Sequence, residues 1–535
     1  MVVSTGKQRC FVNQKSYMNQ PAKTGKHPKG LYVLFATEMW ERFNFYGMRA
    51  ILVLFMTKAL LFNDVFASNL YGSYIGLIYL TPLIGGYVAD RYWGNKRSIF
   101  AGGFIMALGE LFLFFCGTVY NSNSSLSTFL FFTGLGLMIT GNGFFKPNIS
   151  SLVGQLYPAG DTRKDAAYTI FYMGINVGGA LGPLACGFVG DTGDPADFKW
   201  AFLVGAIAML LSLLVQKLYH DKYVRSPDGK ILGETPSYGI DPVSGIGSVQ
   251  SGKAPSAKWL NPFYMVIGLL VFSGIMISAM YLDAHYSYLS YLLAGASLFI
   301  AIFILSDKSL TKVDKQRIWV IFIVCFFVIF FWAAYEQTGA SLVFFADRQT
   351  NLTIGSYTMP ASYFQSFNSI FIILFALPLA WLWVKMGNKQ PATPTKMAMG
   401  LAGLALGYWW IAKGVHNVDP AQKVSMIWLT GMYALHTLGE LCLSPIGLSL
   451  VNKLSPLKFA SLLMAVWFLA NAAGNKLAGV MSALYPQGGK TTVFLGYKMN
   501  NLYDFFMLFV FMAGLAAIIL FLLSKRLQKM MHGIS

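Results

Sequence analysis

Ionisable side chains lie within long apolar stretches of this sequence, where charges are expensive. Five are acids and four are bases: Glu38, Glu41, Glu110, Glu336, Glu440, Arg42, Arg49, Lys146 and Lys476. A charge at the centre of a bilayer-spanning helix costs at least ~2.5–3.5 kcal/mol unless it is paired or hydrated. These residues therefore predict an interior that is ion-paired or filled with water.

Three of the charges form a cluster on one helix face. Glu38, Glu41 and Arg42 are spaced i, i+3 and i+4, and Arg49 continues the same face two turns further on. One guanidinium balances only part of the charge of two carboxylates in a low dielectric. One of the two glutamates is therefore predicted to exchange protons near neutral pH. The alternative is a permanent ion pair that ties helices together.

The elements that must position these charges are membrane helices. Of the 535 residues, 56% are hydrophobic and 12% are charged, whereas soluble domains carry about 25% charged residues. This composition excludes a soluble multidomain enzyme and a disordered scaffold. A helix needs ~20 residues to span a bilayer. Apolar stretches of about this length recur along the sequence in groups of six, two and six: 31–57, 67–89, 98–118, 127–153, 166–190, 199–218, 262–282, 286–305, 318–345, 361–384, 396–413, 424–451, 458–483 and 503–524.

The pattern predicts an all-α polytopic membrane protein with fourteen transmembrane helices. Two six-helix bundles are expected at 31–218 and 318–524. Between them, 219–317 is expected to hold a cytoplasmic loop, two inserted helices and a charged linker. The inserted helices show no evident polar face, so they are expected to pack toward lipid.

The distribution of basic residues predicts the orientation. With both termini inside, cytoplasmic segments hold about 29 of the 40 Lys and Arg residues and the outer loops about 7, whereas the acids divide almost evenly. Residues 1–30 and 525–535 are then cytoplasmic tails. The net charge of +18 is a topology signal rather than a nucleic-acid surface, because the bases fall in short segments between apolar stretches. The five cysteines and six histidines show no metal-binding spacing, so no metal or cofactor is expected.

Several motifs resemble those of known transporters. The segment Gly85-Gly86-Tyr87-Val88-Ala89-Asp90-Arg91, followed by Gly94 and Lys96-Arg97, resembles the loop motif of the major facilitator superfamily. Glu38 to Arg42 reads as the ExxER motif of the proton-dependent oligopeptide transporter (POT) family. Residues 144–148 (FFKPN) and 171–176 (FYMGIN) resemble that family's fourth- and fifth-helix signatures. The resemblance covers residues 31–525, and the combination of motifs is specific.

The resemblance implies a site for a zwitterionic peptide between the two bundles. Arg49 and Lys146 would take the peptide carboxylate, and Glu440 would take the ammonium. Glu336 would pair with Arg49 at the outer side of the cavity. The remaining residues implied to contact the peptide are Tyr46, Tyr79, Asn176, Trp332, Asn368, Ser444 and Trp467. Taken without the family, the two asparagines could equally bond helix to helix, and the aromatic residues could simply pack in the core.

The sequence departs from the family pattern at three positions. Phe45 stands where many relatives carry a tyrosine, so one pocket hydroxyl is expected to be missing. Gly72 stands where some members carry a histidine, and Gly179 where the signature often has serine. Without that histidine, proton coupling is expected to rest on Glu38, Glu41, Arg42 and Glu336. Glu110 and Lys476 have no role implied by the resemblance.

The sequence thus predicts a proton-coupled symporter of di- and tripeptides in a bacterial inner membrane, working as a monomer by alternating access. Its partners would be protons, short peptides and membrane lipid, with no nucleic acid. The alternative with the same fold is a carrier of another small solute, such as an amino acid, nitrate or a peptide-like compound. A membrane enzyme acting on lipid-linked substrates is disfavoured, because no carboxylate pair or histidine cluster near an interface could hold a metal. A non-transporting relative is the remaining alternative.

Overall fold

The computed structural model describes residues 25–158, 160–235, 262–419, 422–486 and 490–533. Most of the predicted tail 1–30, including Cys10, and much of the predicted cytoplasmic loop therefore lie outside the described residues. The chain is almost entirely helical. Its α-helices are α1 Lys29–Leu54, α2 Asp64–Leu80, α3 Pro82–Val88, α4 Gly94–Val119, α5 Ser124–Gln155, α6 Arg163–Gly190, α7 Phe198–Tyr223, α8 Pro262–Tyr286, α9 Leu289–Leu305, α10 Lys312–Tyr335, α11 Ser341–Arg348, α12 Phe364–Met386, α13 Thr393–Val415, α14 Met426–Leu454, α15 Ala460–Ser482 and α16 Leu502–Met530.

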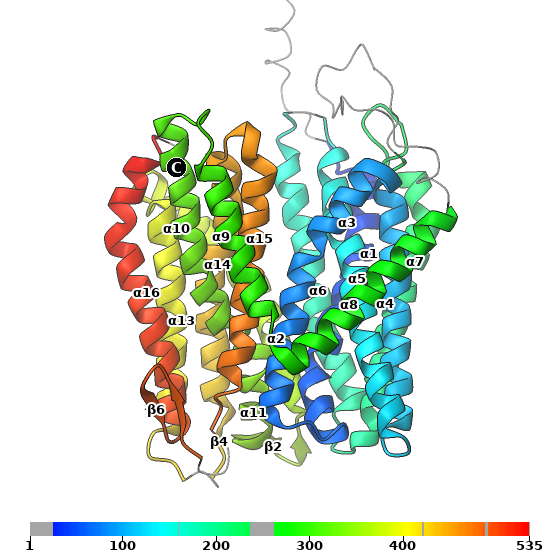
Figure 1. Ribbon diagram of the computed structural model, residues 1–535, viewed down its shortest axis with the longest axis vertical. Helices are drawn as coiled ribbons and strands as arrows, with labels where there is room; N and C mark the ends of the chain where they lie inside the picture. Colours follow the sequence, from blue (N-terminus) through cyan, green and yellow to red (C-terminus); the bar gives the residue numbers. More distant parts are fainter. Residues whose placement is uncertain (1–24, 159, 236–261, 420–421, 487–489, 534–535) are drawn as a thin grey trace, which may run out of the picture.

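The few strands are short and lie at one end of the molecule. They are β1 Thr350–Asn351, β2 Thr353–Ile354, β3 Tyr357–Thr358, β4 Val424–Ser425, β5 Thr492–Phe494 and β6 Tyr497–Met499. β1 pairs with β4 in parallel, and β2–β3 and β5–β6 form antiparallel ribbons. We call this the α11 end, because α11 also lies there (Figure 1).

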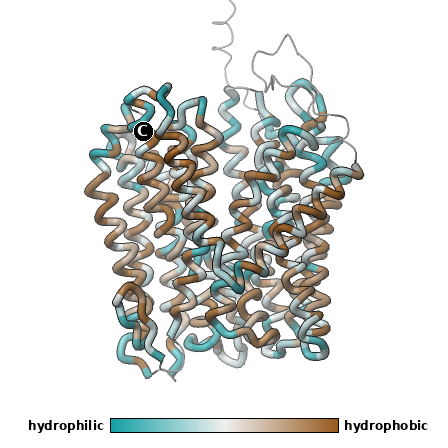
Figure 2. Tube along the Cα trace, in the orientation of Figure 1, coloured by the Kyte–Doolittle hydropathy of each residue, from teal (hydrophilic) through white to brown (hydrophobic). Residues whose placement is uncertain are grey.

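The helices form two groups that stand side by side. α1, α4, α5, α6 and α7 pack together in the amino-terminal half, as do α10, α13, α14 and α16 in the carboxy-terminal half (Figure 1). The halves meet where α2 packs on α15 and α6 on α12. The polar segments gather at the two ends, whereas the helices are hydrophobic over their mid-height (Figure 2). In the described part of the chain, nine helical stretches are long and apolar enough to cross a membrane. The count of fourteen spans and the domain boundaries stay predictions.

Two of the predicted continuous spans are interrupted. The span expected at 67–89 is divided between α2 and α3, because Pro82 lacks the N–H that would continue the helix. A five-residue π-helical turn, Ala89–Trp93, then follows in the loop motif. The span expected at 318–345 breaks after Tyr335, where a 3₁₀ turn, Glu336–Gly339, precedes α11. The second break matters for the site, because it takes Glu336 off the straight path of α10.

Ion pairs join the two halves at the α11 end. Lys58 Nζ lies 2.6 Å from Asp347 Oδ1, and Arg348 Nη1 lies 2.5 Å from Asp64 Oδ2. In each pair one partner belongs to the first helices of the amino-terminal half and the other to α11. These two ion pairs hold the halves closed at this end, whereas the short strands pair only within the carboxy-terminal half.

Candidate functional site

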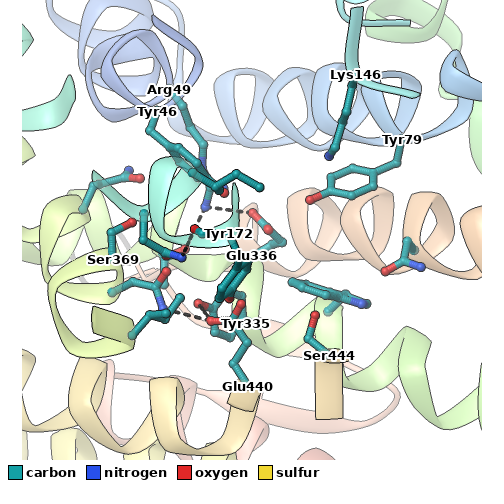
Figure 3. A pocket seen from close by; sticks show the side chains of 18 of the residues that line it. Tyr46, Arg49, Tyr79, Lys146, Tyr172, Tyr335, Glu336, Ser369, Glu440 and Ser444 are labelled. Atoms are coloured by element: carbon teal, nitrogen blue, oxygen red, sulfur yellow. Dashed lines mark hydrogen bonds and ion pairs between the residues drawn. The ribbon is translucent and has the colours of Figure 1, made fainter. Parts of the chain in front are cut away.

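A cavity of about 360 Å³ lies between the two halves. It is lined by α1, α2, α5 and α6 on one side and by α10, α12, α14 and α15 on the other. The structure brings together here the residues predicted to contact substrate and one predicted to carry protons: Tyr46, Arg49, Tyr79, Lys146, Asn176, Trp332, Glu336, Asn368, Glu440, Ser444 and Trp467. Opposite charges come from opposite walls, with Arg49 and Lys146 facing the side that holds Glu440 (Figure 3).

Lys146 is a cation with space in front of it. Its ammonium lies 4.7 Å from the centroid of the Tyr79 ring. Among the residues that the structure describes, no carboxylate lies within ion-pair distance of its Nζ. Pro147 follows it inside α5. Lys146 is thus placed to bind an anion that enters the cavity.

Arg49 is already partnered. Its Nη2 lies 2.9 Å from Glu336 Oε2 and donates to Thr338 Oγ1 at 2.9 Å. Tyr71 donates to the same oxygen of Glu336 at 3.4 Å. The pairing of Arg49 with Glu336 agrees with the sequence expectation, and the 3₁₀ turn after α10 is what places Glu336 and Thr338 toward α1.

Glu440 is held by two donors on one of its oxygens. The hydroxyl of Tyr335 donates to Oε2 at 2.5 Å, and Asn368 Nδ2 donates to the same oxygen at 3.0 Å. Oε1 is left for another donor, and no basic side chain in the described ranges forms an ion pair with Glu440. Sequence reasoning did not single out Tyr335, because one tyrosine is not distinctive in a chain rich in aromatic residues. At the break of α10, the two neighbours reach opposite poles of the cavity: Glu336 contacts Arg49, and Tyr335 contacts Glu440.

The two asparagines differ in what they bind. Asn368 bridges α12 to α14 through Glu440 and Thr437, so it bonds helix to helix and also lines the cavity. Asn176 Nδ2 donates within its own helix, to the carbonyl of Tyr172 at 2.9 Å. The cavity also contains lining residues that were not predicted, namely Tyr172, Ile175, Tyr335, Thr338, Gln365, Ser369, Ile372, Tyr433, Phe468 and Asn471. Nothing in their types or spacing sets them apart in a sequence rich in aromatic residues.

The ExxER cluster lies on α1 outside the cavity lining, and its geometry is asymmetric. Arg42 donates to both oxygens of Glu41, from Nε at 2.5 Å and from Nη2 at 2.8 Å. Asn142 donates a further bond to Glu41 at 3.3 Å. Glu38 reaches only Arg42 Nε, at 3.1 Å, and its Oε2 has no hydrogen-bond partner among the described residues. All three charges are buried. Arg42 therefore serves the two carboxylates unequally, and Glu38 is the less satisfied one. That one of the two glutamates exchanges protons near neutral pH stays a prediction.

The structure corrects one expectation and explains two other departures. Phe45 does not line the cavity, because its ring packs 5.1 Å from the Arg42 guanidinium. Its lack of a hydroxyl therefore removes nothing from the pocket wall. At Gly72 a Cβ would lie 2.7 Å from the Cα of Gly479, so α2 and α15 approach too closely for any side chain. A Cβ at Gly179 would lie 2.4 Å from Ser369 Oγ, so a serine at this position would require the Ser369 side chain of α12 to turn away.

Two further buried charges bond to neighbouring side chains outside the cavity. Glu110 accepts from Asn44 Nδ2 at 2.6 Å and lies outside the cavity. Lys476 pairs with Asp283 of α8. Cys116, Cys186, Cys325 and Cys442 are free and buried. The described residues contain no group of three or more His, Cys, Asp or Glu side chains that could hold a metal ion.

We expect Tyr335 to tune the affinity of Glu440 for a cation. In Tyr335→Phe one donor to Oε2 is lost, and a hydrogen bond to a charged group is worth about 1.5–3 kcal/mol before water replaces it. The expected result is a rise of roughly fivefold in the KM for a cationic substrate, with little change in the maximal rate. If Tyr335 acts through Glu440, the effect disappears in a Glu440→Gln background. An unchanged effect in that background would show that Tyr335 acts independently.

The arrangement of two helical halves around a charged midplane cavity is that of a membrane transporter with the major facilitator fold. A sequence profile described as the POT family matches residues 96–498. A transporter from Bacillus subtilis, YclF, described as uncharacterized, is 34% identical over 489 residues, which is 88% of this chain and 90% of that protein. The peptide transporter YePEPT of Yersinia enterocolitica is 32% identical, covering 85% of this chain and 87% of that protein.

Solved structures agree with these matches. A peptide transporter crystallised with alafosfalin superposes with a TM-score of 0.78 at 30% identity, covering 97% of this chain and 99% of that one. A POT family transporter crystallised with 5-aminolevulinic acid gives a TM-score of 0.75 at 27% identity, covering 95% and 98%. The chain belongs to the POT family of peptide transporters.

Proposed function

We propose that the protein is a proton-coupled symporter that imports di- and tripeptides across a bacterial inner membrane by alternating access. It works as a monomer with both termini in the cytoplasm. The proposal rests on one observation above all. Among the residues that the structure describes, Lys146 on one wall of the cavity has no acidic partner, and Glu440 on the other wall has no basic partner.

A short peptide fits this charge pattern. At neutral pH it carries an ammonium and a carboxylate at its two ends, so it satisfies Glu440 and Lys146 at once. Arg49 is the second cation for the carboxylate, once Glu336 releases it. Because the two poles belong to different halves of the protein, a bound zwitterion draws the halves together. An anion such as nitrate would leave Glu440 unpaired.

Neutral groups around the cavity suit peptides of differing sequence. Asn176 and Asn368 can donate and accept, as the peptide amide requires whatever its side chains. Tyr46, Tyr79, Trp332 and Trp467 supply large apolar faces with polar edges, and Ser444 adds a small hydroxyl. In such a cavity a few polar contacts orient the backbone of a ligand, and the apolar walls select only weakly among its side chains.

Proton coupling is assigned to Glu38, Glu41, Arg42 and Glu336. In the ExxER cluster, Glu38 is the proton carrier, because Arg42 and Asn142 already satisfy Glu41. At the cavity, Glu336 and Arg49 form an ion pair at 2.9 Å. Protonation of Glu336 neutralises its charge and so frees the guanidinium of Arg49 for the peptide carboxylate. The gate and the substrate site are thereby linked through one arginine.

The driving force is sufficient for accumulation. A membrane potential of ~100 mV moves one charge with ~2.3 kcal/mol. Because 1.36 kcal/mol corresponds to a factor of ten, one proton per neutral peptide supports a gradient of about fiftyfold, and more when a pH difference adds to it.

Competition in counterflow tests the substrate class. Proteoliposomes loaded with unlabelled dialanine are expected to exchange it for labelled dialanine. Dialanine and trialanine should compete, whereas free alanine and nitrate should compete at least about tenfold less well, because neither spans the two charged walls. Equal competition by alanine or nitrate would favour the alternative, a carrier of another small solute.

A further inference from the structure

The two inserted helices form a hairpin whose arms lie on different halves of the protein. α8 packs on α5 and α2, whereas α9 packs on α15. In Figure 1, α8 runs obliquely across the amino-terminal half, and the chain turns back into α9 near the seam between the halves. Most of the outer surface of both helices is exposed, as expected for a lipid-facing element. The tip of the hairpin is different.

A buried ion pair ties the tip to both halves. Lys476 of α15 places its Nζ 2.6 Å from Asp283 Oδ2, near the end of α8, and donates to Ser73 Oγ of α2 at 2.7 Å. Ser73 Oγ also hydrogen-bonds to Asp283. The side chains of Asp283 and Lys476 are 0% and 3% exposed. The other oxygen of Asp283 accepts from the backbone N–H of Leu289, which fixes the turn into α9.

The cluster adds one buried polar contact at the tip to two helices whose outer surfaces are mostly apolar and exposed. Asp283 lies just beyond the span predicted at 262–282, and Lys476 had no role implied by the resemblance. Instead the acid ends an otherwise apolar helix and points into the protein, where it compensates the one lysine of α15. An apolar hairpin that only met lipid would not need this residue, because an unpaired charge in a membrane is costly.

The cluster sits where α2 and α15 approach each other closely. Next to it, a Cβ on Gly72 of α2 would lie 2.7 Å from the Cα of Gly479 on α15. One turn further toward the α11 end, Ser68 Oγ and Ser482 Oγ are 3.1 Å apart. Lys476 can therefore reach Ser73 and Asp283 only while α2 and α15 are in contact.

Each arm of the hairpin is fixed to its own half away from the tip. On α8, Ile277 packs on the backbone of Gly136 in α5, where a Cβ would lie 2.4 Å from it. On the other side, Phe303 of α9 meets Phe459, and Asp307 pairs with Lys458 at 2.5 Å. If the halves separate at the α11 end, each arm moves with its own half, so the contacts at the tip between α2, α8 and α15 must break or deform.

We propose that Asp283 and Ser73 form a socket that receives Lys476 when the α11 end is closed, so that the inserted hairpin is a working part of alternating access. The contact stabilises the form that is closed at the α11 end. Opening that end withdraws Lys476 from the socket, and water entering the opened seam takes over its hydrogen bonds. The inference rests on alternating access in the proposed function, but its test needs no substrate.

A cysteine at the seam reports opening directly. Ser68 is fully buried between α2 and α15, so Ser68→Cys should react slowly with a maleimide in detergent, where the reagent reaches both ends of the protein. Adding Asp283→Asn or Lys476→Met should raise the labelling rate about tenfold, because each leaves a buried charge without its partner in the closed form. The exchanged pair, Asp283→Lys with Lys476→Asp, should return most of the protection. The protein without Ser68→Cys gives the background.

Two further variants keep the test decisive. Ser73→Ala removes part of the socket without leaving an unpaired charge, and it should raise labelling about threefold even if the charge variants do not fold. Asp221→Asn breaks an exposed ion pair with Lys96 within the amino-terminal half and should change nothing. Labelling that stays at the parent rate in folded Ser73→Ala, Asp283→Asn and Lys476→Met proteins would overturn the proposal. Opening by these variants in a protein that moves no peptide would leave it standing while the proposed function fails.

Discussion

Glu38→Gln is expected to abolish accumulation of dialanine driven by a proton gradient while leaving counterflow intact. The amide cannot release or take up the proton that Glu38 carries, but it preserves the size of the side chain and a bond acceptor for Arg42, which lies 3.1 Å from Glu38. Accumulation should fall from about fiftyfold to about onefold. Exchange of one peptide for another needs no net proton movement, so it should retain most of its rate.

A matched control variant is available in the same half of the protein. Glu110 is also a fully buried carboxyl group, but it bonds to Asn44 and lies outside the ExxER cluster and the cavity. Glu110→Gln should therefore keep gradient-driven uptake within about twofold of the parent. If Glu38→Gln still accumulates peptide, the proton is carried elsewhere, and Glu41→Gln and Glu336→Gln then decide between the remaining carboxylates.

Glu440→Gln is expected to cause the largest loss of affinity. Removing one partner of a desolvated charge pair costs about 2–5 kcal/mol, which is a rise in KM of roughly thirtyfold or more. The loss should be specific to the amino end of the peptide. The affinity for dialanine, which has a free ammonium, should fall toward the low affinity for N-acetyl-dialanine. The affinity for N-acetyl-dialanine itself should change by less than about threefold.

The comparison of the two peptides distinguishes loss of the contact with the ammonium from a general disruption of the cavity. A collapsed cavity would weaken both ligands alike, whereas loss of the ammonium partner removes the difference between them. If Glu440→Gln transports dialanine with the parent KM, the ammonium binds elsewhere, and the two-pole account of the cavity is wrong.

The sequence predicted well those features that depend on local spacing or on chemical cost. The ExxER cluster is defined by helix periodicity, and the charges within apolar stretches are paired or face the cavity, with the exception of Glu110. The prediction that Arg49 pairs with Glu336 rested on the family resemblance and not on spacing, since the two residues are 287 positions apart in the chain. The same holds for Lys146 and Glu440, which line one cavity but come from different halves.

What the sequence could not predict depends on how the helices are placed. Asp283 lies near the end of the apolar helix α8, and the span predicted at 262–282 ended one residue before it, so the prediction placed this residue in a loop. Only the close approach of α2 and α15 brings Lys476 to it. Tyr335 was missed because one more tyrosine in an aromatic-rich chain carries no signal until the break of α10 turns it toward Glu440. Phe45 was placed in the pocket by analogy, whereas packing turns its ring to Arg42.

Uptake of labelled dialanine into proteoliposomes tests the central claim most directly. An inward proton gradient is imposed on empty vesicles, and uptake is followed before and after an ionophore collapses the gradient. Proton-coupled symport predicts accumulation well above the external concentration, followed by loss to equilibrium when the gradient disappears. Uptake that only equilibrates, and at the same rate with and without the gradient, would contradict coupling. A correctly folded protein that moves no dialanine at all would contradict the assigned substrate.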